Sequence, residues 1–235
     1  TGNWFGVSAL ADTPPFSWLV VPGLNAFIPA NQDAVMLLCF IIGATHLSVA
    51  HLVIAFRQRR SLRALSQIGW TLIVWGSFFV VRYLVLETPI PALTYALLIS
   101  GTLLAVFFAE PQRNLLKGFG IGLGRLPLKL MNCFADLISY IRLFAVGMAT
   151  LAVAASFNEI AAGIGFGNPG RILLASLVLL LGHGINLLMA ALSVVVHGVR
   201  LNMLEFSGHA ELEWAGGAYA PFHLTLAAEN LQPTT

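Results

Sequence analysis

A chain of 235 residues in which 58% are hydrophobic and only 9% are charged does not have the composition of a soluble domain, because such domains carry about 25% charged residues. The formal net charge is only +2, and no basic strip with interleaved aromatic residues is present, so no nucleic-acid partner is expected. Several apolar segments reach roughly 18 residues, the length at which a helix can cross a bilayer. The alternating pattern of a β-barrel is absent. We therefore expect an all-α polytopic membrane protein with about five to six transmembrane helices.

The first part of the chain, residues 1–32, is interrupted by prolines and glycines and is rich in Trp and Phe. This composition is typical of an interfacial loop region. Three apolar spans are expected after it, at about 33–56, 65–86 and 92–109. We interpret residues 33–127 as a set of peripheral transmembrane helices.

A glycine-rich basic stretch, KGFGIGLGRLPLK, follows the third span. No strand is predicted before these glycines and no GK[ST] follows them, so the pattern favours a flexible turn over a nucleotide-binding loop. No ATP site is therefore expected in this chain, and no cofactor is implied. Whether residues 113–127 add a short or re-entrant span is left open by the sequence.

The last two spans are longer than the others, at about 128–163 and 171–208. At 1.5 Å per residue each approaches roughly 50 Å, which exceeds the hydrocarbon core of about 30 Å. Helices of this length must tilt strongly or project beyond the membrane. We expect residues 128–235 to form a pair of tilted helices with a C-terminal tail.

Basic residues indicate how the chain is oriented. Cytoplasmic loops carry an excess of Lys and Arg, and two basic clusters fall on the same side if spans two and three form a hairpin. That side is expected to be cytoplasmic, as is the C-terminus. The clusters are Arg57, Arg59, Arg60 and Arg63, then Arg113, Lys117, Arg125 and Lys129.

Two arginines lie inside the long apolar spans, where a charged group at the bilayer centre costs about 2.5–3.5 kcal/mol. At 100° per residue, the polar residues of the last span fall on one stripe roughly 100° wide. This stripe contains His183, Asn186, Ser193, His197 and Arg200, with Glu205 at about 140° from Arg200.

The preceding span repeats this arrangement, with one polar side that contains Asn132, Asp136, Ser139, Arg142 and Thr150. Two neighbouring helices that each carry a polar stripe with an arginine are typical of the wall of a hydrated path. We therefore predict that the last two helices form the wall of a hydrated path.

Each of these polar residues also has a structural interpretation. The arginines can pair with carboxylates such as Asp136 and Glu205, or extend to the lipid headgroups. His46 and His51 are interpreted as structural. Polar side chains of the last helix can simply bond between helices. Neither cysteine has a nearby Cys or His at ligand spacing, so both are predicted to be free buried thiols, with no metal site: Cys39 and Cys133.

The motif D-x-x-S-Y-x-R-L begins at Asp136 and ends at Leu143, and it is followed by GHGIN and by HGVRLNMLEF. In this order and spacing the motifs resemble the C-terminal membrane domain of the a subunit of V-type rotary ATPases, called subunit I in bacterial and archaeal V/A-type enzymes. The sequence YAPF at Tyr219–Phe222 resembles the end of that family, and GNWFGV resembles one of its earlier regions.

This resemblance implies a stator subunit that forms two ion half-channels against a rotating ring of proteolipids with membrane carboxylates, and so couples proton or sodium translocation to rotation. An arginine at the position of Arg142 attracts the ring carboxylate, and one at the position of Arg200 assists it. The implied half-channel candidates are Asp136, Ser139, His183, Asn186, Ser193, His197 and Glu205.

The resemblance further implies that ATP is hydrolysed on other subunits, and that the partners are the ring, the remaining stator and central-stalk subunits, and the lipid of a bacterial or archaeal plasma membrane. It does not distinguish protons from sodium ions. The alternative function is a secondary ion transporter with a polar site at the membrane midplane. Such transporters often contain internal repeats and broken helices, whereas this sequence shows neither a repeat nor a proline in the middle of the two long spans.

Overall fold

The computed structural model describes residues 5–7, 13–14, 16–25, 28–108 and 115–212. The elements in these residues are all helices, which confirms the all-α class. The α-helices are α1 (Gln32–Arg57), α2 (Arg63–Leu86), α3 (Ala92–Phe107), α4 (Leu115–Ser139), α5 (Ile141–Ile164), α6 (Pro169–Ser193) and α7 (Ser207–His209).

Four helical stretches of the described chain are long and apolar enough to cross a membrane, and the shorter α3 is a fifth apolar helix. The two longest stretches are Leu126–Ile164, with 39 residues, and Pro169–His209, with 41 residues. They correspond to the two long spans expected from the sequence, and the count agrees with the predicted five to six helices.

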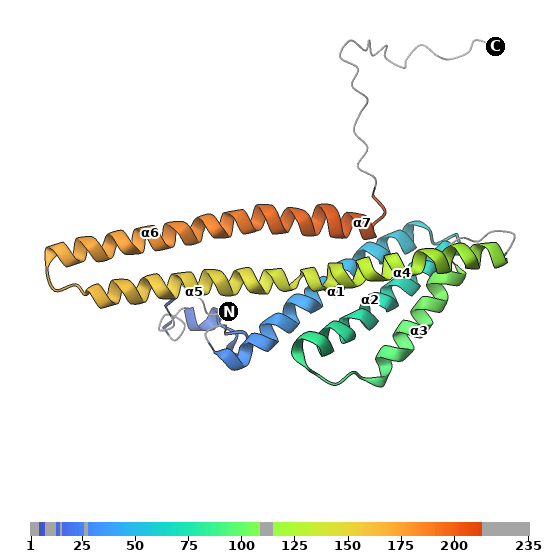
Figure 1. Cartoon of the computed structure of the whole chain (residues 1–235), viewed down its shortest axis with the longest axis horizontal. Helices are drawn as coiled ribbons and strands as arrows, with labels where there is room; N and C mark the ends of the chain where they lie inside the picture. The colour runs from blue at the N-terminus through green and yellow to red at the C-terminus, as the bar shows by residue number, and fades with distance from the viewer. Residues whose placement is uncertain (1–4, 8–12, 15, 26–27, 109–114, 213–235) are drawn as a thin grey trace, which may run out of the picture.

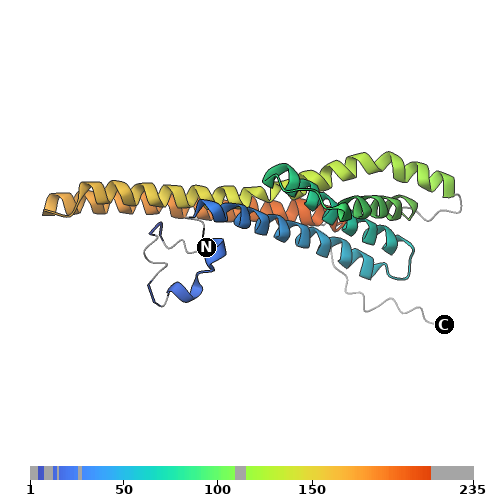
Figure 2. The same cartoon turned by 90° about the horizontal axis from the view of Figure 1, so that it is seen from below.

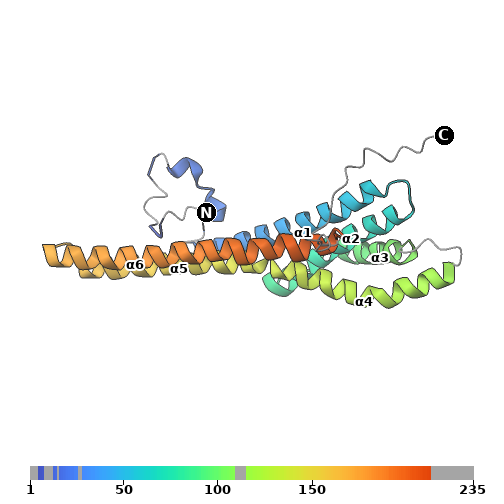
Figure 3. The same ribbon diagram turned by 90° about the horizontal axis from the view of Figure 1, so that it is seen from above.

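The molecule consists of a bundle and a protruding hairpin. Helices α5 and α6 lie side by side and antiparallel, and they extend well beyond the bundle of α1–α4 (Figure 1). Seen from below and from above, the two hairpin helices overlie one another, so the hairpin is a single layer (Figures 2 and 3). Helix α1 crosses α5 at an oblique angle in Figure 1. The hairpin therefore joins the bundle where α4 passes into α5.

The bundle has a close-packed apolar core between α1, α2 and α4. Fully buried side chains include Phe40 and Leu47 from α1, Ile73 from α2 and Leu137 from α4. Cys133 lies in this core and Cys39 is also buried, and both thiols are free, as the sequence predicts. This core fixes α4 and, through it, the start of α5.

Glycines allow the bundle helices to approach closely. A Cβ at Gly69 would lie 2.7 Å from the carbonyl oxygen of Gly101, so α2 and α3 cross almost backbone to backbone. Small residues at such crossings are typical of helix packing in membranes.

The flexible turn predicted over the glycines of residues 117–129 is wrong. The chain there is helical, as part of α4 from Leu115 to Ser139. Gly122 serves packing instead, because a Cβ there would lie 2.9 Å from the carbonyl oxygen of Val106 in α3, whereas a Cβ at Gly120 or Gly124 would meet nothing within 4 Å. Helix α4 continues into α5 after one non-helical residue, Tyr140. The helix that leads into the first long span therefore begins at Leu115, earlier than the sequence suggests.

The second long span changes its winding near its C-terminal end. Helix α6 begins at Pro169, where the Asn168 side chain accepts a hydrogen bond of 2.8 Å from the backbone N–H of Arg171. After Ser193 the helix continues through two π-helical stretches, Val194–Gly198 and Leu201–Phe206, before α7. A π turn holds more residues than an α turn, so residues beyond it point in directions that α-helical spacing does not give.

The N-terminal region contains only short 3₁₀ turns in its described part, at Phe16–Leu19, Pro22–Leu24 and Pro29–Asn31. This agrees with the interruption of residues 1–32 by prolines and glycines. The YAPF motif, the rest of the tail from 213, and Arg113 lie outside the described residues. The division into regions 1–32, 33–127 and 128–235 remains a prediction.

Candidate functional site

The polar stripe of α6 faces α5. Its members His183, Asn186, Ser193 and His197 are only partly exposed, whereas Leu180 and Leu187 on other sides of the helix are each 72% exposed. His183 Nε2 lies 3.2 Å from Asn158 Oδ1 of α5. His183 therefore lies against α5, and the other three are less exposed than these leucines, whereas Arg200, the remaining member of the predicted stripe, is 52% exposed.

Phe5 and Gly6 of the N-terminal region cover the polar stripe at His183. The amide of Asn158 donates a hydrogen bond of 2.8 Å to the backbone oxygen of Phe5, and the Phe5 ring meets the His183 ring edge-on at 6.1 Å. Gly6 has a φ of +74°, and a Cβ there would lie within 2.8 Å of the Ala154 backbone. Only glycine fits this contact without strain.

Glu205 joins the end of α4 to the end of the second long span. Its Oε1 accepts a hydrogen bond of 3.0 Å from Ser139 Oγ and lies 3.4 Å from Arg200 Nε. The Glu205 side chain is 3% exposed and that of Arg200 is 52% exposed. The pairing with a carboxylate that the sequence offers for Arg200 is thus present.

Arg142 differs from Arg200. Its side chain is partly exposed, and among the described residues no hydrogen bond or ion pair to its guanidinium is present. Asp136, the carboxylate that the sequence offers as its partner, instead lies 3.1 Å from His209 Nε2.

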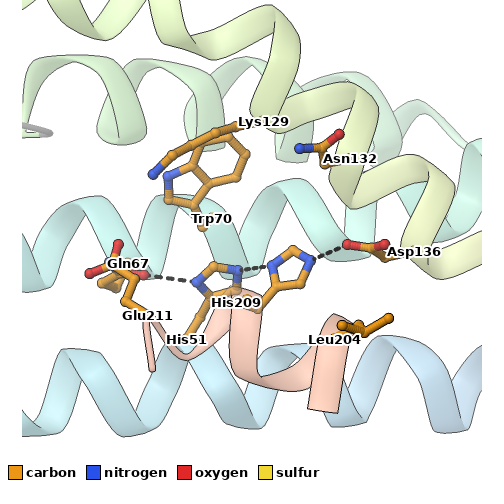
Figure 4. A pocket seen from close by; sticks show the side chains of 10 residues that line it. His51, Gln67, Trp70, Lys129, Asn132, Asp136, Leu204, His209 and Glu211 are labelled. Carbon is orange, nitrogen blue, oxygen red and sulfur yellow. Dashed lines mark hydrogen bonds and ion pairs between the residues drawn. The ribbon is translucent and has the colours of Figure 1, made fainter. Parts of the chain in front are cut away.

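A second polar cluster lies where α7 meets the bundle (Figure 4). His209 Nδ1 is 2.9 Å from His51 Nε2, and His51 Nδ1 is 2.8 Å from Gln67 Oε1. With Asp136 these groups border a cavity of about 330 Å³. Four segments contribute to the cavity, namely α1, α2, α4 and the end of the second long span.

A third contact lies between these clusters. Tyr140, the single residue that separates α4 from α5, has its hydroxyl oxygen 2.7 Å from His46 Nδ1. The His46 ring also stacks on Phe206 at 4.6 Å between ring centroids. Both contacts agree with the structural interpretation of His46.

Three polar atoms of the stripe are buried without a hydrogen-bond partner among the described residues: Asn186 Oδ1, His197 Nδ1 and Glu205 Oε2. Buried polar groups are nearly always hydrogen-bonded, if not to protein then to ordered water. The stripe therefore carries hydrogen-bonding capacity that the described part of the chain does not use.

Comparison with known proteins finds relatives that match nearly the whole chain. The chain is 37% identical over 240 residues to the V-type ATP synthase subunit I of Borreliella burgdorferi, a match that covers 94% of this chain and 38% of that relative. It is 36% identical over 236 residues to V-type ATP synthase subunit I 1 of Treponema pallidum, a match that covers 94% of this chain and 36% of that relative. The chain belongs to the V-type ATP synthase subunit I family.

An archaeal relative supports the same family over a shorter region: an A-type ATP synthase subunit I of Methanocaldococcus jannaschii is 34% identical over 88 residues. No protein-family model and no solved structure matches the chain. The chain spans a little over a third of the length of the first two relatives. Together with the apolar helices, the family establishes a membrane protein.

Sequence reasoning missed part of the cluster in this subunit I chain. His209 falls about 180° from Arg200 at α-helical spacing, which places it on the wrong side of the helix, and the π turns remove that regularity. The sequence favours a structural interpretation of His51 because its spacing of five residues from His46 is poor for a shared ligand site. Its partners Gln67 and His209 are distant along the chain, so no local pattern reveals them. Among the site candidates, Asp136 was found by its place in the motif and by its stripe.

Proposed function

We propose that this chain is the stator subunit of a V/A-type rotary ATPase and forms two ion half-channels against a ring of proteolipids that carry membrane carboxylates. Ion movement through the half-channels, of protons or sodium ions, is coupled to rotation of the ring. ATP is hydrolysed by other subunits. The family supports the rotary ATPase, and the ring contact and the half-channels are the proposal.

The single observation that carries this proposal is the state of Arg142. It is a fixed cation in a membrane-spanning helix without a carboxylate partner among the described residues. A guanidinium does not lose its proton at accessible pH, so it does not relay one. It can hold a passing carboxylate in the ionised form, because a nearby positive charge favours that form.

The surface around Arg142 supports a close protein neighbour. Positions 3, 7, 10 and 14 residues after Arg142 share its helix face, and all four are small and exposed: Ala145, Ala149, Ala152 and Ser156. Small residues let another helix approach closely inside a membrane. A helix of the ring that passes along this face would bring its carboxylate to Arg142.

The polar clusters on either side of Arg142 support two offset half-channels. The cavity at Asp136 lies on one side of Arg142 along α4 and α5, and the contact between Asn158 and His183 of the polar stripe lies on the other. Between them, Glu205 links Ser139 to Arg200. We assign the Asp136 end to the cytoplasmic side, as the positive-inside rule predicts.

A cross-linking experiment tests the ring contact. Ala145→Cys adds a thiol one turn beyond Arg142 on the same face, and both native cysteines are buried. In the assembled ATPase, oxidation is expected to form a disulfide between residue 145 and a cysteine placed one turn from the ring carboxylate. The product is measured as a subunit I–proteolipid band on a non-reducing gel.

The matched control is Ile99→Cys on α3, which is also highly exposed but lies on another helix. It is expected to form no such band. Equal cross-linking from residues 99 and 145, or none from residue 145 in the assembled complex, would contradict the placement of the ring.

A further inference from the structure

The cluster at Asp136 is a continuous chain of hydrogen bonds between four side chains (Figure 4). The distances are 2.8 Å from Gln67 Oε1 to His51 Nδ1, 2.9 Å from His51 Nε2 to His209 Nδ1, and 3.1 Å from His209 Nε2 to Asp136 Oδ2. All three lie within the range of real hydrogen bonds. His51 is 5% exposed, so the middle of the chain is shielded from water.

The orientation of the Gln67 amide determines which atom donates in its hydrogen bond with His51. The Gln67 amide nitrogen lies 3.5 Å from Glu211 Oε1, and a carboxylate only accepts hydrogen bonds. The amide nitrogen therefore faces Glu211 and the amide oxygen faces His51. Because an amide oxygen also only accepts, the proton of this bond is on His51 Nδ1.

The remaining bonds then require one proton more than the neutral groups supply. A neutral His51 that is protonated at Nδ1 accepts at Nε2, so His209 donates from Nδ1. A neutral His209 would in turn present a lone pair at Nε2 to an ionised Asp136, and two acceptors form no hydrogen bond. Three bonds need three protons, whereas two neutral imidazoles and a carboxylate contain two.

We propose that this cluster is a proton-binding site that holds one exchangeable proton between His209 Nε2 and Asp136 Oδ2. The proton comes from water in the adjoining cavity and returns to it, and no other bond is made or broken. The amide of Gln67 cannot accept the proton and pass it on, so the chain stores a proton and does not conduct one through to α2.

The charges around the site favour occupancy. The ionisable groups that border the cavity are Lys129 from α4, Asp136, Glu211 and the two histidines. Lys129 balances one of the two carboxylates, and the stored proton balances the other. Lys129 and Glu211 are exposed to solvent, whereas the Asp136 side chain is only 29% exposed. A carboxylate that is partly removed from water is favoured when a proton and a hydrogen-bond partner compensate its charge.

Release of the proton has a structural consequence. Neutral His209 keeps its bond to His51, but its Nε2 then faces the Asp136 carboxylate with no proton between them. The contact of His209 with Asp136 of α4 is lost, while the contact of His209 with His51 of α1 and the hydrogen bond between Ser139 and Glu205 remain. Proton binding thus fastens this end of the helix to the wall of the cavity.

This inference deepens the proposed function, since it names the proton as the ligand at the Asp136 end. Asp136→Asn is designed to remove the additional proton while all three hydrogen bonds of the cluster are kept. The amide that this substitution introduces can donate to His209 Nε2, so all three hydrogen bonds form without the additional proton. The variant is therefore expected to assemble as the wild type does, and His209→Phe, which keeps a ring of similar shape, provides a second variant.

The measurement is infrared difference spectroscopy of the assembled, reconstituted ATPase between alkaline and acidic pH, with ring-labelled histidine. The wild type is expected to show a titrating band of a protonated histidine–aspartate pair, and both variants are expected to lose it. His46→Gln, which removes a histidine of α1 outside the chain, is expected to keep the band.

Persistence of the band in Asp136→Asn, or its loss in His46→Gln, would overturn the site. Displacement of the band by excess sodium ions at constant pH would overturn the proton as its ligand. Variants of Arg142 leave these groups in place and are expected to retain the band. The proton site and the stator function can therefore fail separately.

Discussion

Arg142→Ala is expected to abolish ATP-driven ion pumping by reconstituted vesicles while the complex still assembles. The guanidinium has no partner among the described residues, so its removal breaks no ion pair within that part of the chain. It does remove the charge that would keep a ring carboxylate ionised as it passes. Pumping is measured as the quench of a pH-sensitive dye and as uptake of labelled sodium, so that either ion is detected.

Arg142→Lys is expected to lose most of the pumping as well, because an ammonium is a point charge without the planar fork that matches a carboxylate. The control is Arg171→Ala, which removes an exposed arginine from the outer end of α6. This variant is expected to pump normally. Normal pumping by Arg142→Ala in an assembled complex would refute the stator role.

Gly182→Ala is expected to separate the two long helices and to destabilise the subunit. A Cβ at position 182 would overlap the side chain of Phe157. The overlap includes the Cβ of Phe157, which no side-chain rotation can move away. Overpacking of this kind costs about 1–3 kcal/mol, although alanine by itself favours a helix over glycine by up to about 1 kcal/mol. The loss is measured by denaturant titration of the complex in detergent.

Gly184→Ala is the matched control, because it makes the same change two residues along the same helix. A Cβ at position 184 meets nothing within 4 Å, so this variant is expected to be neutral or slightly stabilising. If the two variants unfold alike, the close contact between α5 and α6 at Gly182 does not support the hairpin.

The positions of the helices could be predicted from the apolar composition of the spans and from the residues that interrupt them. The expected spans at 33–56, 65–86 and 92–109 correspond to α1, α2 and α3 within a few residues, because prolines and basic or polar loops mark their ends. The start of α4 was missed, since glycines in sequence indicate a turn. Close packing of Gly122 against α3 favours the helix there, and such a contact is not visible in a single sequence.

The site was predictable where one helix face carries it and not where several segments meet. Regular α-helical spacing grouped His183 with Asn186 and Ser193, and the structure places this group toward α5. The link from Ser139 to Glu205, and that from Asp136 to His209, both depend on π turns and on tertiary packing. Neither can be calculated from residue spacing.

The protruding hairpin gives the molecule an uneven stiffness. Its inner end is clamped in the bundle, while its outer end carries only the exposed loop with Gly165 at a φ of +75° (Figure 1). Such a beam, fixed at one end, bends under a sideways load, and its deflection grows steeply with distance from the clamp. A partner that moves along the hairpin would therefore displace its outer end more easily than its inner end. The contacts of Phe5 and Gly6 with α5 would limit this displacement.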